Sequence, residues 1–396
     1  MANTNAEQIP RSPHAPTLGI IGGGQLAKML GAAAAPLGVQ TLVLSENPHC
    51  PAAATCQRVI LGDPDELDSL RELARQVDVI TLENEFIDAA LLRQLESEAH
   101  LVRPGSRTMH LVQDKLVQKT TLRASGLAVP SFMEVPDLAS VELAIAELGL
   151  PLVLKKRRNG YDGKGNATLR TAGDAKLAWE LLEGDDNPLF AEQFCDFSSE
   201  LAVMITRSLD GSAVTYPVVE TAQHHHICHT VKAPADIQSG LARQVKTLAL
   251  NAVSAVHGVG TFGVELFLAR NGQVLINELA PRVHNSGHYT IEACICSQFE
   301  NHIRAVLGWP LGSPEMRAPA AVMVNLLGTE KGSGHPHGIE RALATPGAHI
   351  HVYGKTTSAP SRKMGHVTAL GETLDEAWQT AHNAAQALRF GANTHS

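Results

Sequence analysis

Apolar strand-like segments alternate with helical segments over roughly the first 110 residues, and this pattern constrains the fold more than any other feature. The strands are expected at Leu18–Ile21, Gln40–Leu44 and Asp78–Leu82, and the helices at Gln25–Leu37 and Leu67–Arg75. Strands that alternate with helices typically form a parallel sheet covered by those helices. The sequence therefore predicts a parallel α/β domain at residues 17–112, preceded by a disordered tail at residues 1–16.

Strands dominate from Gln113 onward, and we expect two more domains, at residues 113–312 and 313–396, separated by the turn-rich stretch Gly308–Pro319. The fold class is therefore α/β in the N-terminal domain and α+β overall. The expected strands are Leu152–Lys155, Leu189–Gln193, Glu200–Arg207, Val214–Val219, Ala321–Leu327 and His349–Tyr353, with a hairpin at Gly263–Leu279 and helices at Lys115–Ala124 and Thr290–Leu307.

Composition excludes several classes of protein. A chain of 396 residues is too long for one ordinary core, and 44% hydrophobic with 18% charged residues is a soluble globular balance. The formal charge of −8 disfavours general nucleic-acid binding. No uncharged apolar run of about 18 residues is present, so no membrane span is expected. The six cysteines form neither a metal-type spacing nor a disulfide framework, which favours reduced thiols in a cytoplasmic protein.

The expected hairpin places two acidic residues opposite each other. Asn271-Gly272 is typical of a two-residue turn, because both central residues need positive φ. Counting back from that turn pairs Glu265 with Glu278, with their Cβ atoms about 5 Å apart on one face of the sheet. Both acids interrupt apolar strands, and buried acids are usually paired or bound to metal. Magnesium, which prefers oxygen ligands and phosphate partners, is the expected metal. An exposed hairpin with two solvated acids is the alternative.

The glycine-rich segment after the strand Leu152–Lys155 is a candidate phosphate-binding loop. Gly160, Gly163 and Gly165 would let backbone N–H groups approach phosphate oxygens closely. Lys155 would meet the same phosphates as a fixed ammonium group. The spacing is not that of a Walker A motif, and a flexible basic surface loop is the alternative.

A polar run, Asn277–His288 (NELAPRVHNSGH), follows the second acidic strand. Phosphoryl transfer needs in-line positioning and cationic stabilisation of the spreading charge. Arg282, four residues after the proposed metal ligand Glu278, would supply that stabilisation. The alternative is a polar turn with a structural arginine.

The turn Gly22-Gly23-Gly24 follows the first strand and opens a helix, as in dinucleotide-binding proteins. Such a turn also suits any other anionic ligand or simply tight packing, so an NAD-binding protein remains one alternative. Near the C-terminus, Lys355 and Arg362 are typical of a site for a substrate phosphate, or of solvated surface charge.

Seven segments carry a family resemblance: GGGQL at Gly22–Leu26, QDKLVQK at Gln113–Lys119, GYDGKG at Gly160–Gly165, EQF at Glu192–Phe194, NELAPRVHNSGH at Asn277–His288, SQFE at Ser297–Glu300 and RKMGH at Arg362–His366. In this order the chain resembles the ATP-grasp superfamily and, within it, the 5-(carboxyamino)imidazole ribonucleotide synthase family, from Leu18 to about Leu388. The resemblance implies an N-terminal pre-ATP-grasp domain, a two-part ATP-grasp domain, a small C-terminal β-rich domain and a homodimer.

The resemblance also implies a reaction of purine biosynthesis. ATP and Mg²⁺ would activate bicarbonate as carboxyphosphate, which would carboxylate the exocyclic amine of 5-aminoimidazole ribonucleotide. The residues implied at ATP are Lys115, Lys155, Gly160, Tyr161, Asp162, Gly163, Lys164, Gly165, Asn166, Glu192, Gln193, Phe194, Cys195, Glu200, Gln223, Asn277 and Glu278. Those implied at the ribonucleotide are Gly24, Gln25, Leu26, Glu83, Lys355, Arg362 and Lys363. The implied catalytic residues are Arg282, His284, Asn285, Tyr161 and Asp162, and the implied metal ligands are Glu265 and Glu278.

Two positions depart from the family pattern. Gln223, or a histidine that follows it, stands where a family histidine contacts the nucleotide, and Ala359 begins a stretch that lacks one family arginine. Another ATP-grasp ligase or carboxylase with a different amine or acid acceptor is therefore an alternative. A nucleotide-sensing protein without catalysis is a further one.

Overall fold

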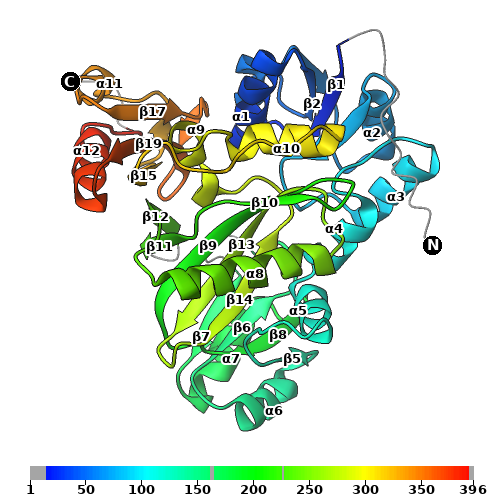
Figure 1. Ribbon diagram of the computed structural model, residues 1–396. Coiled ribbons are helices and arrows are strands. Elements are labelled where there is room, and N and C mark those ends of the chain that lie inside the picture. Colours follow the sequence, from blue (N-terminus) through cyan, green and yellow to red (C-terminus); the bar gives the residue numbers. More distant parts are fainter. Residues whose placement is uncertain (1–14, 161–164, 225–226, 392–396) are drawn as a thin grey trace.

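The computed structural model describes residues 15–160, 165–224 and 227–391. Figure 1 shows the N-terminal elements in blue and cyan beside the C-terminal elements in orange and red, with the green central elements next to both. Helix α10 (Gln298–Leu307) packs on helix α1 (Gln25–Ala34), and Phe299 and Ile303 share a buried cluster with Leu30. The central part of the chain therefore returns to pack on the N-terminal domain.

The N-terminal domain is built on a parallel sheet with strand order β3-β2-β1-β4, which confirms the expected fold class. Its strands are β1 (Thr17–Ile21), β2 (Gln40–Ser45), β3 (Arg58–Leu61) and β4 (Val79–Leu82), and its helices are α1, α2 (Leu67–Ala74), α3 (Ala89–Ser97) and α4 (Ser106–Gln113). Sequence patterns do not predict β3, because this short strand exposes both of its end residues. The carboxyl ends of β1 and β4 lie side by side, so the segments that follow them meet at one edge.

An antiparallel sheet with strand order β5-β8-β6-β7 forms a separate layer at the bottom of Figure 1. Helix α5 (Lys115–Ala124) leads into this layer. Its elements are β5 (Phe132–Val135), α6 (Leu138–Leu148), β6 (Leu152–Lys156), β7 (Asn166–Leu169), α7 (Ala175–Leu181) and β8 (Leu189–Gln193). Apolar residues of α6 and α7 pack against these strands in one buried cluster.

A larger sheet has the order β14-β13-β9-β11-β12-β15-β19-β17, with β10 beside β9. Because β12 pairs with β15, the sheet continues across the expected domain boundary at residues 312 and 313. Helix α8 lies over β9 and β14, and α12 lies over β15 and β19 (Figure 1). The elements are β9 (Phe197–Arg207), β10 (Ala213–Thr215), β11 (Val219–His224), β12 (Ile227–Ala233), α8 (Ser239–Ala255), β13 (Gly260–Ala269), β14 (Val274–Ala280), α9 (Thr290–Ala293), β15 (Ala320–Leu327), α11 (Ile339–Leu343), β17 (Ala348–Val352), β19 (Lys363–Gly371), α12 (Leu374–Gln386) and the short pair β16 (Gly332–Ser333) and β18 (Thr357–Ser358).

Two expected elements are wrong in their extent. The expected strand at residues 214–219 is split between β10 and β11. The expected helix at residues 290–307 is two helices, because Ser297 is extended and caps α10 by accepting a hydrogen bond from the Glu300 N–H at 3.2 Å. Because the serine side chain caps the helix that follows, ending the preceding helix at this position costs little free energy.

The hairpin of β13 and β14 corrects the expected turn while keeping the expected pair. The loop has three residues, Arg270 to Gly272, because Ala269 pairs with Gln273, and Gly272 has a φ of 84°. A bulge then adds one residue, Asn277, to β14, since Leu266 faces Ile276 whereas Glu265 faces Glu278. The longer loop shifts the residue pairing by one position and the bulge shifts it back by one. Glu265 and Glu278 are therefore opposite each other.

Candidate active site

The opposed carboxylates of Glu265 and Glu278 lie at the centre of the candidate site. Their side chains keep 28% and 34% of their area exposed, respectively, while the flanking Val264 and Leu266 are buried. The Lys115 ammonium donates to Glu278 Oε2 at 2.7 Å, and His284 Nε2 lies 3.6 Å from Glu265 Oε1. The two acids are therefore half-buried and each has a side-chain neighbour, rather than both lying free in solvent.

The two carboxylates of this pair differ in how they are compensated. Burial, and then the charge of Glu278, raises the pKa of Glu265. Burial acts in the same sense on Glu278, but the charge and hydrogen bond of Lys115 outweigh it and lower the pKa of Glu278. Two adjacent carboxylates with one lysine fit a divalent cation that keeps phosphate and water ligands. Within the described residues no group of three or more His, Cys, Asp or Glu side chains forms an all-protein metal cage.

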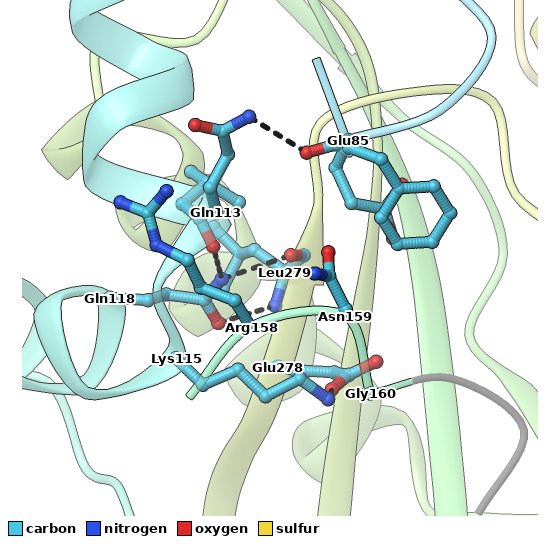
Figure 2. A pocket seen from close by; sticks show the side chains of 11 residues that line it. Glu85, Gln113, Lys115, Gln118, Arg158, Asn159, Gly160, Glu278 and Leu279 are labelled. Atoms are coloured by element: carbon cyan, nitrogen blue, oxygen red, sulfur yellow. Dashed lines mark hydrogen bonds and ion pairs between the residues drawn. The ribbon is translucent and has the colours of Figure 1, made fainter. Parts of the chain in front are cut away.

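Helix α5 is locked to β14 beside these acids. The Gln118 amide accepts from the Leu279 N–H at 2.8 Å and donates to the Leu279 carbonyl at 3.0 Å. Asp114 caps the helix and also receives the guanidinium of Arg157, and the Lys115 N–H donates to the Arg157 carbonyl at 2.8 Å. These contacts fix the Lys115 side chain over Glu278, as Figure 2 shows.

A pocket opens between helix α5, the end of β14 and the start of the glycine-rich loop (Figure 2). It is lined by Glu85, Phe86, Val112, Gln113, Lys115, Gln118, Arg158, Asn159, Gly160, Glu278 and Leu279. Acidic, basic and amide groups thus surround one hollow that reaches the proposed metal ligand.

The two lysines expected to bind phosphate contact different carboxylates. Lys115 contacts Glu278, whereas the Lys155 ammonium donates to Glu192 Oε1 at 2.6 Å. Glu192 also pairs with Lys119, and both partners of that pair are 3% exposed. Burial would raise the pKa of Glu192, but the charges of Lys119 and Lys155 outweigh it and lower that pKa. Burial lowers the pKa of Lys119 to about 8. Sequence reasoning gave Lys119 no role, although it lies four residues after Lys115 and hence on the same helix face.

The glycine-rich loop is described only at its ends, because Tyr161, Asp162, Gly163 and Lys164 lie outside the described residues. Gly160 and Gly165 lie close together, and the Lys156 N–H donates to the Gly165 carbonyl at 2.8 Å. Asn166 begins β7 and pairs with Lys155. The loop thus starts and ends beside the two strands that carry Lys155 and Glu192.

The remaining residues expected at the nucleotide lie on strands β8, β9, β11 and β14 or in the segment between β8 and β9. Glu200 on β9 pairs with Thr221 of β11 and Phe267 of β13, and burial raises its pKa to about 7. Gln193 and Phe194 are exposed, Cys195 is half-buried, Gln223 is exposed at the end of β11, and Asn277 is the bulge residue beside Glu278. Their role at the nucleotide stays a prediction.

Arg282 is held by a residue that sequence reasoning missed. Its Nε and Nη2 atoms donate to the two carboxylate oxygens of Glu85, at 2.5 Å and 3.0 Å. Glu85 lies in the segment after β4, and its carbonyl accepts from Gln113 at 2.9 Å. The signal that would have found Glu85 is its position just past the carboxyl end of a parallel strand, where ligand-binding residues of such sheets gather.

The glycine turn receives a carboxylate of its own chain. The Gly24 and Leu26 N–H groups donate to the two oxygens of Glu83 at 2.6 Å and 3.2 Å. Burial raises the pKa of Glu83, against these two hydrogen bonds and the charges of Arg282 and Lys355. Because these N–H groups at the start of α1 are taken by Glu83, the geometry disfavours the pyrophosphate of a dinucleotide.

His284 and Asn285 are both fixed by neighbours. His284 Nδ1 lies 2.6 Å from Ser286 Oγ, and burial, with the charges of Arg282 and Lys363, lowers the pKa of His284 to about 3. The imidazole is therefore neutral near pH 7. Asn285 and Asn325 exchange two amide hydrogen bonds, at 2.9 Å and 2.7 Å, which tie the site to the C-terminal part of the sheet.

The cations near the C-terminus are only partly brought to this site. Lys355 and Lys363 lie close enough to influence the pKa of Glu83 and Glu265, respectively. Arg362 is exposed and donates to the carbonyl and hydroxyl of Thr357 in its own loop. Gln25 opens helix α1 beside Glu83.

Comparison with known proteins decides the family. The chain is 43% identical over 352 residues to the N5-carboxyaminoimidazole ribonucleotide synthase of Synechococcus elongatus, which covers 89% of this chain and 88% of that protein. The chain belongs to this synthase family. Three domain families also match: a ribonucleotide synthetase preATP-grasp domain at residues 15–113, an ATP-grasp domain at residues 120–299 and a phosphoribosylaminoimidazole carboxylase C-terminal domain at residues 321–380.

Solved structures of the synthase family have the same fold. N5-carboxyaminoimidazole ribonucleotide synthetase from Thermotoga maritima matches with a TM-score of 0.85 and 38% identity, over 96% of this chain and 100% of that one. The synthase from Aspergillus clavatus, in complex with ADP and 5-aminoimidazole ribonucleotide, matches with a TM-score of 0.85 and 34% identity, over 94% of this chain and 98% of that one. The expected ATP-grasp architecture and the family resemblance are confirmed.

Proposed function

We propose that the chain catalyses the ATP-dependent carboxylation of 5-aminoimidazole ribonucleotide by bicarbonate, with release of ADP and phosphate. The observation that supports this most is the opposed pair Glu265 and Glu278, in which Glu278 accepts a hydrogen bond from the Lys115 ammonium and also lies close enough for its charge to raise the pKa of Arg282. That arrangement matches the needs of phosphoryl transfer, in which charge must be neutralised and reactants held in line. The identity of the amine acceptor is inferred from relatives that are named as synthases of this product.

The nucleotide end of the site is assigned by charge. Lys115 and Lys155 would bind the ATP phosphates, and residues 160–166 would cover them. Glu200, whose half-buried carboxylate can accept hydrogen bonds from hydroxyl groups, would bind the ribose, and Glu192 to Cys195 would border the adenine. Mg²⁺ at Glu265 and Glu278 would neutralise the phosphate oxygens as the transferred group develops charge.

The acceptor end is assigned from the glycine turn and the C-terminal cations. Glu83 with Gly24, Gln25 and Leu26 would contact the ribonucleotide, and Lys355, Arg362 and Lys363 would bind its phosphate. Arg282, His284 and Asn285 would surround the carboxyphosphate, together with Tyr161 and Asp162. His284 is neutral near pH 7, so it would donate or accept a hydrogen bond without adding charge.

The proposal extends to the setting of the enzyme. Bicarbonate as the carbon source, a homodimer and a cytoplasmic location belong to it. All six cysteines lie within the described residues and are free thiols, which suits a reducing compartment. No helix in the described part of the chain is long and apolar enough to cross a membrane.

A coupled assay of ADP release tests the reaction. Purified protein with ATP, Mg²⁺ and bicarbonate is expected to release ADP faster when 5-aminoimidazole ribonucleotide is added, and not with other amines or acids of a panel. Stimulation by a different acceptor would indicate another ATP-grasp ligase, and the absence of any stimulation would contradict the proposal.

The metal assignment is tested in the same assay by Glu278→Gln. We expect turnover to fall by at least roughly 100-fold, because a charged ligand and the partner of Lys115 are both lost. The matched control is Glu98→Gln, which removes an exposed carboxylate paired with Arg71 on the N-terminal domain. Equal activity in the two variants would show that Glu278 is not a metal ligand.

A further inference from the structure

Glu85 and Arg282 form a two-point contact between distant parts of the chain. Glu85 comes from the segment after β4, whereas Arg282 follows β14. The side chains are 25% and 18% exposed, so solvent only partly screens the pair. A carboxylate that meets both Nε and Nη2 fixes the plane of a guanidinium as well as its position.

The contact leaves part of Arg282 available to a ligand. Its Nη1 atom also donates to the Val283 carbonyl at 3.3 Å. A guanidinium has five N–H donors, so the Glu85 and Val283 contacts leave one on each terminal nitrogen without a partner among the described residues. Two N–H donors of the guanidinium are thus left for an anion while Glu85 holds the other edge.

The backbone around Glu85 is itself anchored. Gln113 at the end of α4 donates to the carbonyls of Glu85 and Ile87, and Figure 2 shows Gln113 directed at Glu85. Two residues before Glu85, the carboxylate of Glu83 binds the N–H groups that open helix α1. One short acidic segment thus joins the glycine turn, the pocket wall and the guanidinium of Arg282.

We propose that Glu85 is a positioning residue that holds the Arg282 guanidinium in the orientation in which it steadies carboxyphosphate until the amine attacks. This inference rests on the proposed function. In that reaction a bicarbonate oxygen bonds to the γ-phosphorus of ATP and ADP leaves. The amine nitrogen then bonds to the carboxyl carbon and loses a proton, while the C–O bond to phosphate breaks and its electron pair leaves with phosphate.

The consequence of losing Glu85 is uncoupling. Within the described residues no hydrogen bond or ion pair joins Glu85 to Lys115, Lys155 or the proposed metal ligands, and the Glu85 charge acts on Lys115 only as the last of several causes. Transfer of the phosphoryl group to bicarbonate would therefore continue. Carboxyphosphate bound by a misoriented guanidinium would instead break its C–O bond early and give carbon dioxide and phosphate. ADP would then be formed without carboxylated amine.

The test compares Glu85→Gln with Glu98→Gln, the exposed two-point partner of Arg71 on the same domain. In Glu85→Gln we expect kcat for the carboxylated product to fall roughly 10- to 100-fold, as for other residues that orient a catalytic group. The KM for ATP is expected to stay within about twofold. The ratio of ADP to carboxylated product is expected to rise above the wild-type ratio, whereas Glu98→Gln keeps that ratio.

Glu85→Asp separates charge from reach. It keeps the carboxylate but shortens the side chain, so the two-point contact is lost and a raised ADP-to-product ratio is again expected. It replaces Glu85→Gln if that variant does not fold, as judged by its thermal unfolding. Wild-type coupling in a folded Glu85 variant would overturn the inference even if its stability is reduced. Failure of the wild-type protein to respond to the ribonucleotide would instead overturn the proposed function.

Discussion

At the scale of single residues, pairing of opposite charges explains how the side chains of the candidate site are held in place. Glu278 is paired with Lys115, Glu192 with Lys119 and Lys155, and Arg282 with Glu85. Among the described residues the neutral His284 lies beside Glu265, and the charges of Lys115 and Lys363 act on Glu265 without forming an ion pair with it. An acid left without a cation in a partly buried position is costly. Glu265 is therefore the residue whose environment most clearly requires an added positive charge.

The Gly24 position tests the glycine turn. Its φ of −81° suits any residue, but a Cβ there would lie 2.1 Å from Glu83 Oε1. We expect Gly24→Ala to displace Glu83, to raise the KM for the ribonucleotide and to lower the free energy of unfolding by roughly 1–3 kcal/mol. Gly240→Ala in α8 is the control, since its Cβ meets nothing within 4 Å. Thermal unfolding and ribonucleotide titration check both variants, and unchanged values for Gly24→Ala would contradict this account of the turn.

At the scale of elements, buried polar contacts hold the helices and sheets in register. His302 on α10 accepts from the Thr261 N–H of β13 at 3.0 Å and lies 2.7 Å from the Thr81 hydroxyl of β4. One imidazole thus joins the strand that leads to Glu265 with the strand that leads to Glu83 and Glu85. Burial lowers the pKa of His302 to about 4 from its usual 6.5, so the folded protein prefers the neutral ring.

This preference makes stability depend on pH in a defined window. The folded pKa lies below the unfolded one, so the stabilisation is complete above pH 6.5 and is lost as pH falls toward 4. The full effect is about 3 kcal/mol in the free energy of unfolding. In His302→Gln, urea unfolding at a series of pH values is expected to show a shallower slope across this window than in the wild type. His49→Gln, at an exposed position, is expected to keep the wild-type slope; equal slopes in the wild type and His302→Gln would contradict the assignment.

The helices and strands also show which parts of the fold can be predicted from sequence patterns. Strong alternation and turn residues are enough to predict β1, β2, β8 and α5 within a residue or two. They are not enough for the loop of the β13–β14 hairpin, because a three-residue loop with a glycine at positive φ and a two-residue turn share the Asn-Gly signature. The pairing of Glu265 with Glu278 was predicted only because the bulge at Asn277 offset that error.

Contacts between distant segments are what the sequence could not supply. Lys119 belongs to a recognisable segment and Glu85 does not, but the partners of both lie 73 and 197 residues away, respectively, and are brought near only by the fold. The candidate roles of Lys115 and Glu83 follow from the family resemblance, and that of Arg282 also from its position four residues after Glu278, whereas the residues that orient them are evident only in the fold. Long-range pairing is set by packing of whole elements and not by local pattern.

At the scale of the whole molecule, one sheet and one helix join the site to all parts of the chain. The pairing of β12 with β15 carries the central sheet into the C-terminal domain, and Asn325 on β15 reaches Asn285. Lys28 on α1 donates to the carbonyls of Val352 and Tyr353, which ties the N-terminal domain to β17. The residues proposed for the ribonucleotide come from the N-terminal part and the C-terminal part of the chain, so that binding of the ribonucleotide would bring their contributions together.

The most direct test of the whole account is a crystal of the protein grown with ATP and Mn²⁺, examined by anomalous scattering at the manganese edge. The account predicts a peak between the carboxylates of Glu265 and Glu278, each within about 2.2 Å of the ion, with phosphate oxygens completing its coordination. A nucleotide bound with its metal elsewhere, or carboxylates turned away from the ion, would contradict it.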